Sequence, residues 1–506
     1  MGIFNESVKN DNIVGAATGY EIYGLDRNDF LQISDVSDIV DFDEGHNFLL
    51  GQSGGGLITA PAGFIDIGNE SLYENSELLE SGSYESRFAN MWNIQSSVEE
   101  PALNLIMGTP EVDILNGTDG NDLIYALESD DTVFGGEGDD ILYGDEGDDT
   151  LNGSAGADTM FGGIGSDTLS YEGSSGAVTI SLLDNTASGG DAEGDVISEF
   201  ENITGSDFDD TLTGDAGDNT LNGGAGADTL VGGLGYDTLS YANSSSAVNV
   251  NLSTNAVSGG DAEGDTISSF ENVIGSNYDD VLTGASYKNN IFDGGDGIDT
   301  VDYSDAPAGT SGRGVYVSLD GTPSPNTSLY SAESRGDIIN NVENVIGSNY
   351  GDYIYGDDSD NIIYGGGNAN YDWLYGGAGN DMIFGEDGND GIYGEAGDDT
   401  LIGGLGADII DGGDGDDTMI GGLGADTFAY SLESDSISTA YDTITDFTQT
   451  EDVMQFEDSV FGTDWTAFSS DVSSGTQTVI THATLTDFEL RLTGVYTLDE
   501  TDFVFA

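Results

Sequence analysis

The sequence predicts an all-β chain built from very short strands that are separated by glycine-rich turns. Three observations lead to this prediction: a nine-residue repeat, an aspartate and an apolar side chain at fixed places within it, and a longer repeat with a 70-residue offset laid over it. Internal repeats of this kind indicate an array of stacked units rather than one globular core.

The nonapeptide appears in four runs, which cover residues 108–170, 205–240, 275–302 and 347–429. A typical unit is GGEGDDILY at Gly135, and nearly every unit has aspartate at position six and an aliphatic residue or Met at position eight. Glycine allows the positive φ angles of a tight turn over positions one to six. Positions seven to nine then form a short strand, whose eighth side chain points inward while the seventh and ninth point outward.

The aspartates at position six are the candidate metal ligands. A turn that exposes backbone carbonyls beside a carboxylate suits a hard cation, and Ca²⁺ takes six to eight oxygen ligands. The chain has no Cys, so no thiolate is available for a softer metal. The candidates are Asp113, Asp122, Asp131, Asp140, Asp149, Asp158, Asp167, Asp210, Asp228, Asp237, Asp280, Asp299, Asp352, Asp381, Asp390, Asp399, Asp408, Asp417 and Asp426.

These units resemble the RTX (repeats-in-toxin) family of haemolysin-type calcium-binding repeats, whose nonapeptide is GGxGxDxUx. The resemblance implies a parallel β-roll in which successive turns stack along two edges and Ca²⁺ ions lie between stacked turns. A disordered Gly/Asp-rich linker is the alternative, and the register held over seven consecutive units from Gly108 argues against it. The resemblance also implies glycine carbonyl ligands, at Gly136, Gly138, Gly163, Gly165, Gly224, Gly226, Gly233, Gly235, Gly377, Gly379, Gly404, Gly406, Gly413, Gly415, Gly422 and Gly424.

Several units depart from this pattern. The unit at Ala126 has no glycine, so its turn is a doubtful calcium site. We expect a one-residue slip at Asp293 and an eleven-residue unit at Gly365 to interrupt the stacking. Asparagine replaces the aspartate, which keeps an oxygen but loses a charge, at Asn219, Asn289 and Asn361.

The longer repeat separates the runs. Residues 171–204 match residues 241–274, and residues 303–346 form a diverged third copy. Each copy contains an alternating strand and returns to the nonapeptide, so we expect β-hairpin-like insertions that extend or cap a roll segment. The acidic loops Asp191–Asp195 and Asp261–Asp265 either bind another cation or are solvated turns.

The two ends lack the nonapeptide. Residues 1–107 form an N-terminal domain of unknown type and begin without the apolar segment of a secretory signal peptide. Residues 430–506 are predicted to be β-rich, and their start is similar to the C-terminal region of serralysin-type proteins. The acidic-then-apolar tail 502–506 is similar to the uncleaved signal of type I secretion. This likeness implies a secreted, extracellular or cell-surface protein that meets a type I secretion apparatus.

The composition excludes several classes of protein. The chain has 96 acidic and 7 basic residues, for a net charge of −89, which disfavours binding to nucleic acid or to an anionic membrane surface. No apolar stretch is long enough for a membrane span. Such a charge is typical of a disordered chain, so we expect disorder until a bound cation neutralises the repeats.

No catalytic motif fits the chain, and we predict that it is not an enzyme. Ser53 lies in a GxSxG sequence, but the residues before the repeats are too few for that hydrolase fold. With only His46 and His482, the chain cannot form an HExxH zinc site.

The predicted function is that of a structural, surface-layer, matrix or adhesive component that folds on extracellular calcium. One alternative is a binding or assembly module for a separate partner or surface glycan, and another is an enzyme with an unrecognised site in residues 1–107 or 430–506. The fourth run carries aromatic ninth positions that either bind such a partner or simply stack across strands. With two units per coil we expect one ladder of Tyr355, Tyr375 and Tyr393, and another of Tyr364 and Phe384.

Overall fold

The computed structural model describes residues 103–505 apart from nine short gaps, and of residues 1–102 it describes only the strands. The gaps are 286–287, 310–311, 325–329, 332–333, 368–369, 431–440, 458–464, 474–476 and 484–487. The described residues contain many short strands, and none of their helices is long and apolar enough to cross a membrane. The helical turns are η1 (Gly190–Ala192), η2 (Gly260–Ala262) and η3 (Trp465–Ala467). The predicted all-β fold is thus confirmed.

The chain forms two compact units. Unit 1 contains residues 1–149 and 163–165, and unit 2 contains residues 150–162 and 166–506.

The first strands of unit 1 already form a parallel array. Partners such as Gly2 and Tyr20, or Asn12 and Phe30, are 18 residues apart, which is twice the nonapeptide length. An 18-residue coil therefore exists where the glycine signature is missing, a feature that the sequence analysis did not detect. One sheet has the order β1 (Gly2–Asn5), β3 (Tyr20–Leu25), β5 (Ile39–Phe42), β7 (Ile58–Thr59). The other has the order β2 (Asn12–Ala16), β4 (Phe30–Ile33), β6 (Phe48–Gly51), β9 (Glu70–Tyr73), β8 (Phe64–Ile67), with β9 antiparallel to both neighbours.

The same unit contains the start of the first nonapeptide run. Its strands pair in parallel with an 18-residue offset, for example Leu123 with Ile141. They are β10 (Asn104–Met107), β12 (Asp122–Glu128) and β14 (Ile141–Glu146) on one face, and β11 (Ile114–Asn116) and β13 (Thr132–Glu137) on the other.

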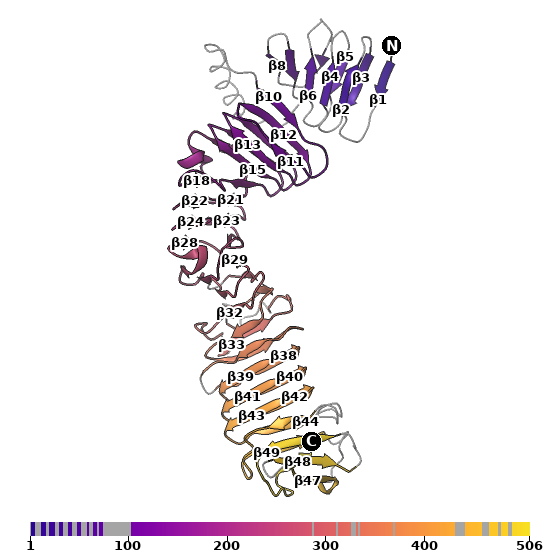
Figure 1. Cartoon of the computed structure of the whole chain (residues 1–506), viewed down its shortest axis with the longest axis vertical. Helices are drawn as coiled ribbons and strands as arrows, with labels where there is room; N and C mark the ends of the chain where they lie inside the picture. Colours follow the sequence, from indigo (N-terminus) through magenta and orange to yellow (C-terminus); the bar gives the residue numbers. More distant parts are fainter. Residues whose placement is uncertain are drawn as a thin grey trace. The chain divides into compact units, whose positions relative to one another are not determined.

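Unit 2 continues this architecture in parallel sheets, whose strands follow one another coil by coil (Figure 1). One series is β15 (Thr150–Ala155), β17 (Thr168–Ser170), β21 (Asn202–Thr204), β23 (Thr220–Asn222), β25 (Thr238–Ser240), β29 (Asn272–Ile274), β31 (Ile291–Asp293), β34 (Ile338–Asn340). A short series pairs β16 (Thr159–Ile164) with β20 (Val196–Ser198). A third is β19 (Thr186–Ser188), β18 (Thr179–Ser181), β22 (Thr211–Thr213), β24 (Thr229–Val231), β28 (Thr266–Ser268).

Two longer sheets follow. One is β27 (Ala256–Ser258), β26 (Asn249–Asn251), β30 (Val281–Thr283), β32 (Thr300–Asp302), β35 (Asn344–Ile346), β37 (Ile362–Tyr364), β39 (Met382–Asp387), β41 (Thr400–Leu405), β43 (Thr418–Leu423), β45 (Thr443–Ile444), β49 (Glu489–Thr493), β48 (Gln477–His482), β47 (Phe468–Ser473). The other is β33 (Arg313–Ser318), β36 (Gly351–Tyr355), β38 (Trp373–Ala378), β40 (Gly391–Ala396), β42 (Ile409–Asp414), β44 (Thr427–Tyr430), β46 (Val453–Phe456), β50 (Phe503–Phe505).

The core lies between the two faces of the roll and consists of the eighth side chains. Leu230, Ile392 and Leu401 are representative, with exposed fractions of 0%. Their inward orientation follows from strand alternation, because a three-residue strand turns its middle side chain to the face opposite its ends.

Each insertion ends one sheet, continues a second and starts a third. In the first copy β20 is the last strand of its sheet, β21 continues the next series, and the antiparallel hairpin of β18 and β19 begins a new one. The second copy repeats this arrangement with β28, β29 and the hairpin of β26 and β27. The predicted hairpin-like insertions are thus present in these two copies.

Two expected interruptions do not occur. The long unit at Gly365 is absorbed in its turn, and β38 still pairs with β36 and β40. The slip lies before Asp293, inside the turn of residues 284–290, and β31 pairs with both β29 and β34. An extra residue in a turn leaves the strand register intact, because the turn and not the strand changes length.

The predicted aromatic ladders are present on the outer faces of the last run. Tyr355, Tyr375 and Tyr393 stack with ring centroids 4.6 and 4.9 Å apart, and Tyr364 stacks on Phe384 at 4.7 Å. Trp373 on β38 adds a parallel row beside the first ladder.

Candidate calcium sites

Aspartates at position six form hydrogen-bonded ladders along the turns. Along an uninterrupted run, the backbone N–H of one aspartate donates to Oδ1 of the aspartate one coil later. In unit 2, Asp381 donates to Asp399 at 2.7 Å and Asp399 donates to Asp417 at 2.8 Å. One carboxylate oxygen of each residue is therefore committed to the fold, and the other is left for a further partner.

That second oxygen is buried and has no hydrogen-bond partner in ten of the predicted ligands. These aspartates are between 0% and 2% exposed. A buried carboxylate oxygen without a partner is costly, so such a row indicates missing positive charge. The ten are Asp131, Asp228, Asp237, Asp299, Asp381, Asp390, Asp399, Asp408, Asp417 and Asp426. Four further predicted ligands are equally buried, namely Asp140, Asp149, Asp158 and Asp167.

The glycine-rich turns bring carbonyl oxygens to the same place. A methyl group added at Gly376 would overlap Asp381 Oδ2 and approach the carbonyl oxygen of Gly394 in the next coil. Positions two and four of these turns have φ in the left-handed region, for example 115° at Gly377 and 117° at Gly379. All sixteen glycines predicted from the resemblance have such positive φ.

The donor set consists of oxygen atoms alone. Among the described residues no group of three or more His, Cys, Asp or Glu side chains could hold a metal, so a site here needs backbone carbonyls as well as carboxylates. Hard oxygen ligands in a flexible turn fit Ca²⁺, whose coordination number is high and whose geometry varies.

Burial changes the protonation of these aspartates. It raises the pKa of Asp228, Asp381 and Asp399 to about 7, and that of Asp408 and Asp426 to about 6. Desolvation disfavours the charged carboxylate, and a nearby cation would reverse this effect.

Five predicted ligands lie in a different kind of turn, in which a Ser or Thr at position two bonds the aspartate. Ser154, at the same position in the turn of Asp158, bonds Asn152 instead. In the five turns the backbone N–H of position two donates to Oδ2 of the aspartate at 2.5–2.6 Å, and the hydroxyl group bonds the same carboxylate. Protein donors thus take the place where a cation would lie. The five are Asp113, Asp122, Asp210, Asp280 and Asp352.

We call a turn open when none of its own groups donates a hydrogen bond to Oδ2 of its aspartate. The unit at Ala126 adopts such an open turn although it contains no glycine. Leu127 and Ser129 have φ of 91° and 81°, so they adopt the left-handed conformation that glycine adopts elsewhere. Asp131 in this turn has a buried Oδ2 like its glycine-flanked counterparts.

The insertions contain ladder residues that the sequence analysis missed. Asp195, Asp265 and Asp337 accept the backbone N–H of Asp158, Asp228 and Asn290. Their second oxygens accept a tyrosine hydroxyl at 2.8 Å, from Tyr171, Tyr241 and Tyr303. The two predicted acidic loops therefore end in structural carboxylates rather than in solvated ones. Asp372 was also missed, and it continues the ladder between Asp352 and Asp390.

On the other edge, glutamates replace the aspartate. Glu201, Glu271 and Glu343 accept the backbone N–H of Asp167, Asp237 and Asp299 at 2.7–3.0 Å. In the following turn an asparagine amide donates to the backbone carbonyl of each glutamate, from Asn219, Asn290 and Asn361. Asn290, and not Asn289, thus holds the ladder position, because the extra residue lies earlier in its turn.

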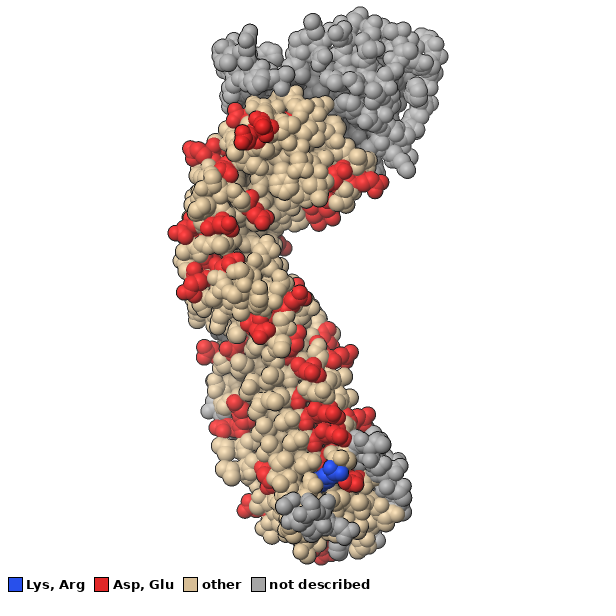
Figure 2. All heavy atoms as spheres, in the orientation of Figure 1, with Lys and Arg blue, Asp and Glu red and all other residues tan. Residues whose placement is uncertain are grey.

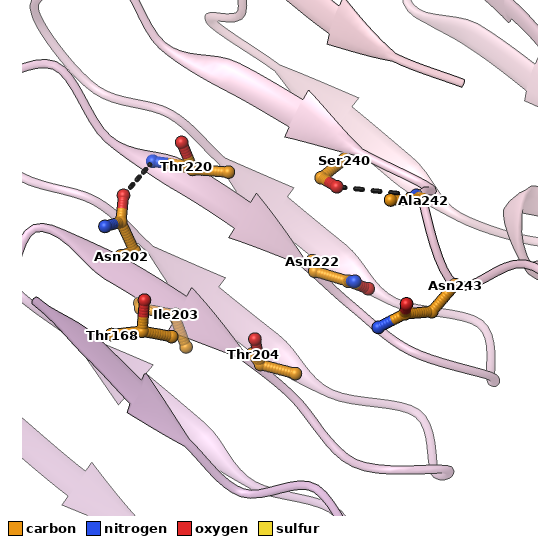
Figure 3. A pocket seen from close by; sticks show the side chains of 9 residues that line it. All are labelled: Thr168, Asn202, Ile203, Thr204, Thr220, Asn222, Ser240, Ala242 and Asn243. Atoms are coloured by element: carbon orange, nitrogen blue, oxygen red, sulfur yellow. Dashed lines mark hydrogen bonds between the residues drawn. The ribbon is translucent and has the colours of Figure 1, made fainter. Parts of the chain in front are cut away.

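One shallow cavity in unit 2 is of a different nature (Figure 3). It measures about 260 Å³ and lies on the outer face of β17, β21, β23 and β25. Its lining is neutral, which does not suit a cation: Thr168, Asn202, Ile203, Thr204, Thr220, Asn222, Ser240, Ala242 and Asn243. Ser53 and His46 lie outside the described residues, and His482 is buried on β48.

Stacked 18-residue coils with a buried carboxylate and converging carbonyls in each open turn define a parallel β-roll of the metal-binding kind. A family model described as the RTX calcium-binding nonapeptide repeat (4 copies) matches residues 107–142, 134–169, 204–239, 340–372, 367–401 and 393–428. The chain therefore carries RTX calcium-binding nonapeptide repeats, as the sequence predicted.

Two other comparisons complete this result. One similar solved structure is the solution structure of a subunit of the mannuronan C5-epimerase of Azotobacter vinelandii, with 28% identity over 29% of this chain and 80% of that one, and a TM-score of 0.21. A comparison with curated protein sequences found no match.

Proposed function

We propose that the chain is a secreted structural, surface-layer, matrix or adhesive component whose roll folds when calcium binds to the open turns. The supporting observation is the row of buried Oδ2 atoms without a partner. The ligands we propose are the carboxylates of the open turns together with carbonyl oxygens of their glycines. We leave out the five aspartates beside a Ser or Thr, because their own turns supply the donors.

The energetics support a dependence on calcium. A buried polar group without a partner costs about 1–3 kcal/mol, and more if it is charged. Ten such oxygens therefore impose a cost on the folded chain that a bound cation would remove. Bound calcium would neutralise these carboxylates and link neighbouring coils. At ten times Kd, each site adds about 1.4 kcal/mol.

The charge distribution supports a soluble chain with an acidic surface. Asp and Glu side chains occur all along the visible face of the described residues, whereas basic ones are scarce (Figure 2). In the proposed role, low calcium inside the cell keeps the repeats unfolded for a type I secretion apparatus, and extracellular calcium folds them outside. The protein then acts without catalysis of its own.

Circular dichroism of the full chain tests the calcium step. We expect a coil-to-β transition on adding millimolar CaCl₂ and its reversal by a chelator. A chain that is equally folded in millimolar CaCl₂ and in chelator would refute calcium-dependent folding. Electron microscopy and light scattering of the calcium-loaded chain test the structural role, for which we expect assemblies.

The aromatic ladders favour a second candidate, a module that binds a surface glycan or a protein partner. The rings of Tyr375 and Tyr393 are only half-buried on the outer face. Glycan-array binding that is lost in the Tyr375→Ala/Tyr393→Ala variant, with unchanged circular dichroism, would favour this candidate over the structural one.

A further inference from the structure

Three pairs of carboxylates recur where the roll enters an insertion. Each pair joins the aspartate of an open turn to the glutamate of the insertion: Asp167 with Glu201, Asp237 with Glu271, and Asp299 with Glu343. In all three, glutamate Oε2 accepts the aspartate's N–H, so the second glutamate oxygen has no role in this bond.

The third pair has the features of a cation site. Asp299 is 0% exposed, and its Oδ2 has no partner. A methyl group at Gly294 would overlap both this Oδ2 and the carbonyl oxygen of Asn341, so two oxygens from successive turns converge there. Glutamate does not occupy this position in the nonapeptide pattern.

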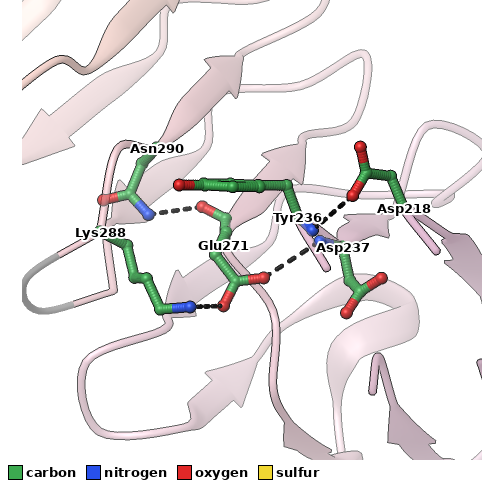
Figure 4. Close-up of polar contacts among 6 residues, drawn as sticks. All are labelled: Asp218, Tyr236, Asp237, Glu271, Lys288 and Asn290. Atoms are coloured by element: carbon green, nitrogen blue, oxygen red, sulfur yellow. Dashed lines mark hydrogen bonds and ion pairs between the residues drawn. The ribbon is translucent and has the colours of Figure 1, made fainter. Parts of the chain in front are cut away.

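The middle pair already has a cation. Lys288 Nζ lies 2.9 Å from Glu271 Oε1, and the Glu271 side chain is 8% exposed (Figure 4). The same ammonium group lies over the ring of Tyr236, 5.8 Å from its centre. Lys288 reaches Glu271 from the following turn, so it bridges two coils.

The turns that follow the three glutamates differ in charge. The differences agree with an ion pair at Glu271 alone. The turn after Glu201, residues 214–219, contains Asp215 and Asp218, and the turn after Glu343, residues 356–361, contains three aspartates. The turn after Glu271, residues 284–290, has Ala285 in place of the first aspartate and gains Lys288. The copy with a built-in ammonium group has thus lost acidic groups, whereas the other two have kept them.

We propose that Glu201 and Glu343 are further ligands that complete the calcium sites of Asp167 and Asp299, and that Lys288 supplies the positive charge at Asp237–Glu271 instead. This inference rests on the proposed calcium-dependent roll. Carboxylates held together in a buried turn need a counter-charge, which a divalent ion or an ammonium group can provide. The entry to the middle insertion is therefore the one of the three that needs no metal, so Asp237 is set apart from the other open-turn ligands proposed above.

Native mass spectrometry of the full chain in saturating calcium tests this, because it counts bound ions. We expect Glu201→Gln and Glu343→Gln each to bind one ion fewer than the wild type. Glu271→Gln is the matched control and should bind the same number, whereas Lys288→Gln should bind one more. Glutamine keeps the oxygen that accepts the aspartate N–H, so circular dichroism should remain unchanged.

If Glu201→Gln and Glu343→Gln bind as many calcium ions as the wild type, the two glutamates are not calcium ligands. One ion fewer in Glu271→Gln, or an unchanged count in Lys288→Gln, would overturn the role of Lys288. A wild-type chain that binds no calcium would instead refute the proposed function itself, so the two failures are distinguishable.

Discussion

The uninterrupted stack of residues 376–429 and the insertion of residues 241–274 build the same ladder with different partners. In the stack, the Oδ2 atoms of Asp381, Asp399 and Asp417 are buried without a donor. In the insertion, the Tyr241 hydroxyl bonds Asp265, and Lys288 bonds Glu271. One backbone arrangement therefore occurs in a form whose second carboxylate oxygen has no hydrogen-bond donor from the protein, and in a form whose second oxygen is satisfied by the protein's own side chains.

This difference shows which atoms of the ladder make folding depend on a bound ion. The hydrogen-bonded edge of the ladder is common to both regions, so it does not require a cation. The requirement comes from the second carboxylate oxygen, and a hydroxyl, amide or ammonium group removes it. We expect the two regions to respond oppositely to changes at that oxygen.

Acid should produce the largest effect, because it acts on all open turns together. Burial raises the pKa of Asp228, Asp299, Asp381 and Asp399 to about 7. A carboxyl whose pKa is raised in the folded chain stabilises it fully below the unfolded pKa of about 4, and this stabilisation is lost as pH rises towards 7. The calcium-free roll should thus be most stable near pH 4, and calcium affinity should fall as pH drops from 7 to 5. Urea unfolding in the presence of a chelator measures the first trend, and calcium titrations measure the second, both between pH 4 and 7. Equal affinity at pH 5 and 7 would contradict the pKa shifts.

Tyr241→Phe should have the next largest effect. It leaves the Oδ2 of Asp265 without its donor, at a cost of about 2 kcal/mol, and the loss should be similar with and without calcium. Tyr375→Phe, which removes a hydroxyl from the outer ladder, is the control and should change stability by less than about 0.5 kcal/mol. A loss that calcium fully restores would mean that the insertion also depends on the ion.

The effect of Asp399→Asn on the free energy of unfolding should change sign when calcium is added. Asparagine keeps Oδ1 for the Asp381 N–H and replaces Oδ2 by an amide that can donate to the nearby Gly412 carbonyl, as Asn361 does to Glu343. In chelator the variant should be more stable than the wild type, and in ten times Kd of calcium it should lose about 1.4 kcal/mol, the contribution of one site. Parallel urea titrations measure both values, and destabilisation under both conditions would argue against a cation site.

Glu386→Gly should have the smallest effect, a stabilisation of about 1 kcal/mol with or without calcium. Glu386 is a non-glycine residue with φ of 68°, and glycine adopts this conformation without strain. The neighbouring Asp387→Gly, where φ is not in the left-handed region, should destabilise instead. Thermal unfolding compares the pair, and equal shifts would show that the backbone conformation at Glu386 carries no strain.

The fold could be predicted from local signals to a large extent. The nine-residue period sets the strand register, so the inward residues and the Tyr355–Tyr375–Tyr393 ladder follow from counting along the chain. The parallel pairing of the first strands could not be predicted, because no glycine pattern marks their 18-residue offset. The Gly365 unit was misjudged because a turn can lengthen without moving its strand.

The sites could be predicted only in part. Position six located the carboxylates, but the second oxygen decides their role, and its partner often lies far along the chain. The second oxygen of Asp337 accepts a hydrogen bond from the Tyr303 hydroxyl, 34 residues earlier, and no period relates the two. The Ser or Thr at position two was visible in the sequence, but its hydroxyl contact with the aspartate became apparent only from the turn geometry.

The aromatic ladder gives the last run an optical reporter. Trp373 lies between Tyr353 and Tyr393, at 6.3 and 5.9 Å, and these three rings come from three successive coils. At such distances, light absorbed by tyrosine is transferred to tryptophan efficiently. Transfer from Tyr371, whose ring lies 5.3 Å from Trp373, is local to one coil, whereas transfer from Tyr353 and Tyr393 requires the three coils to be stacked. In a variant without Trp92 and Trp465, tyrosine-excited emission from Trp373 would therefore follow the assembly of this part of the roll in real time.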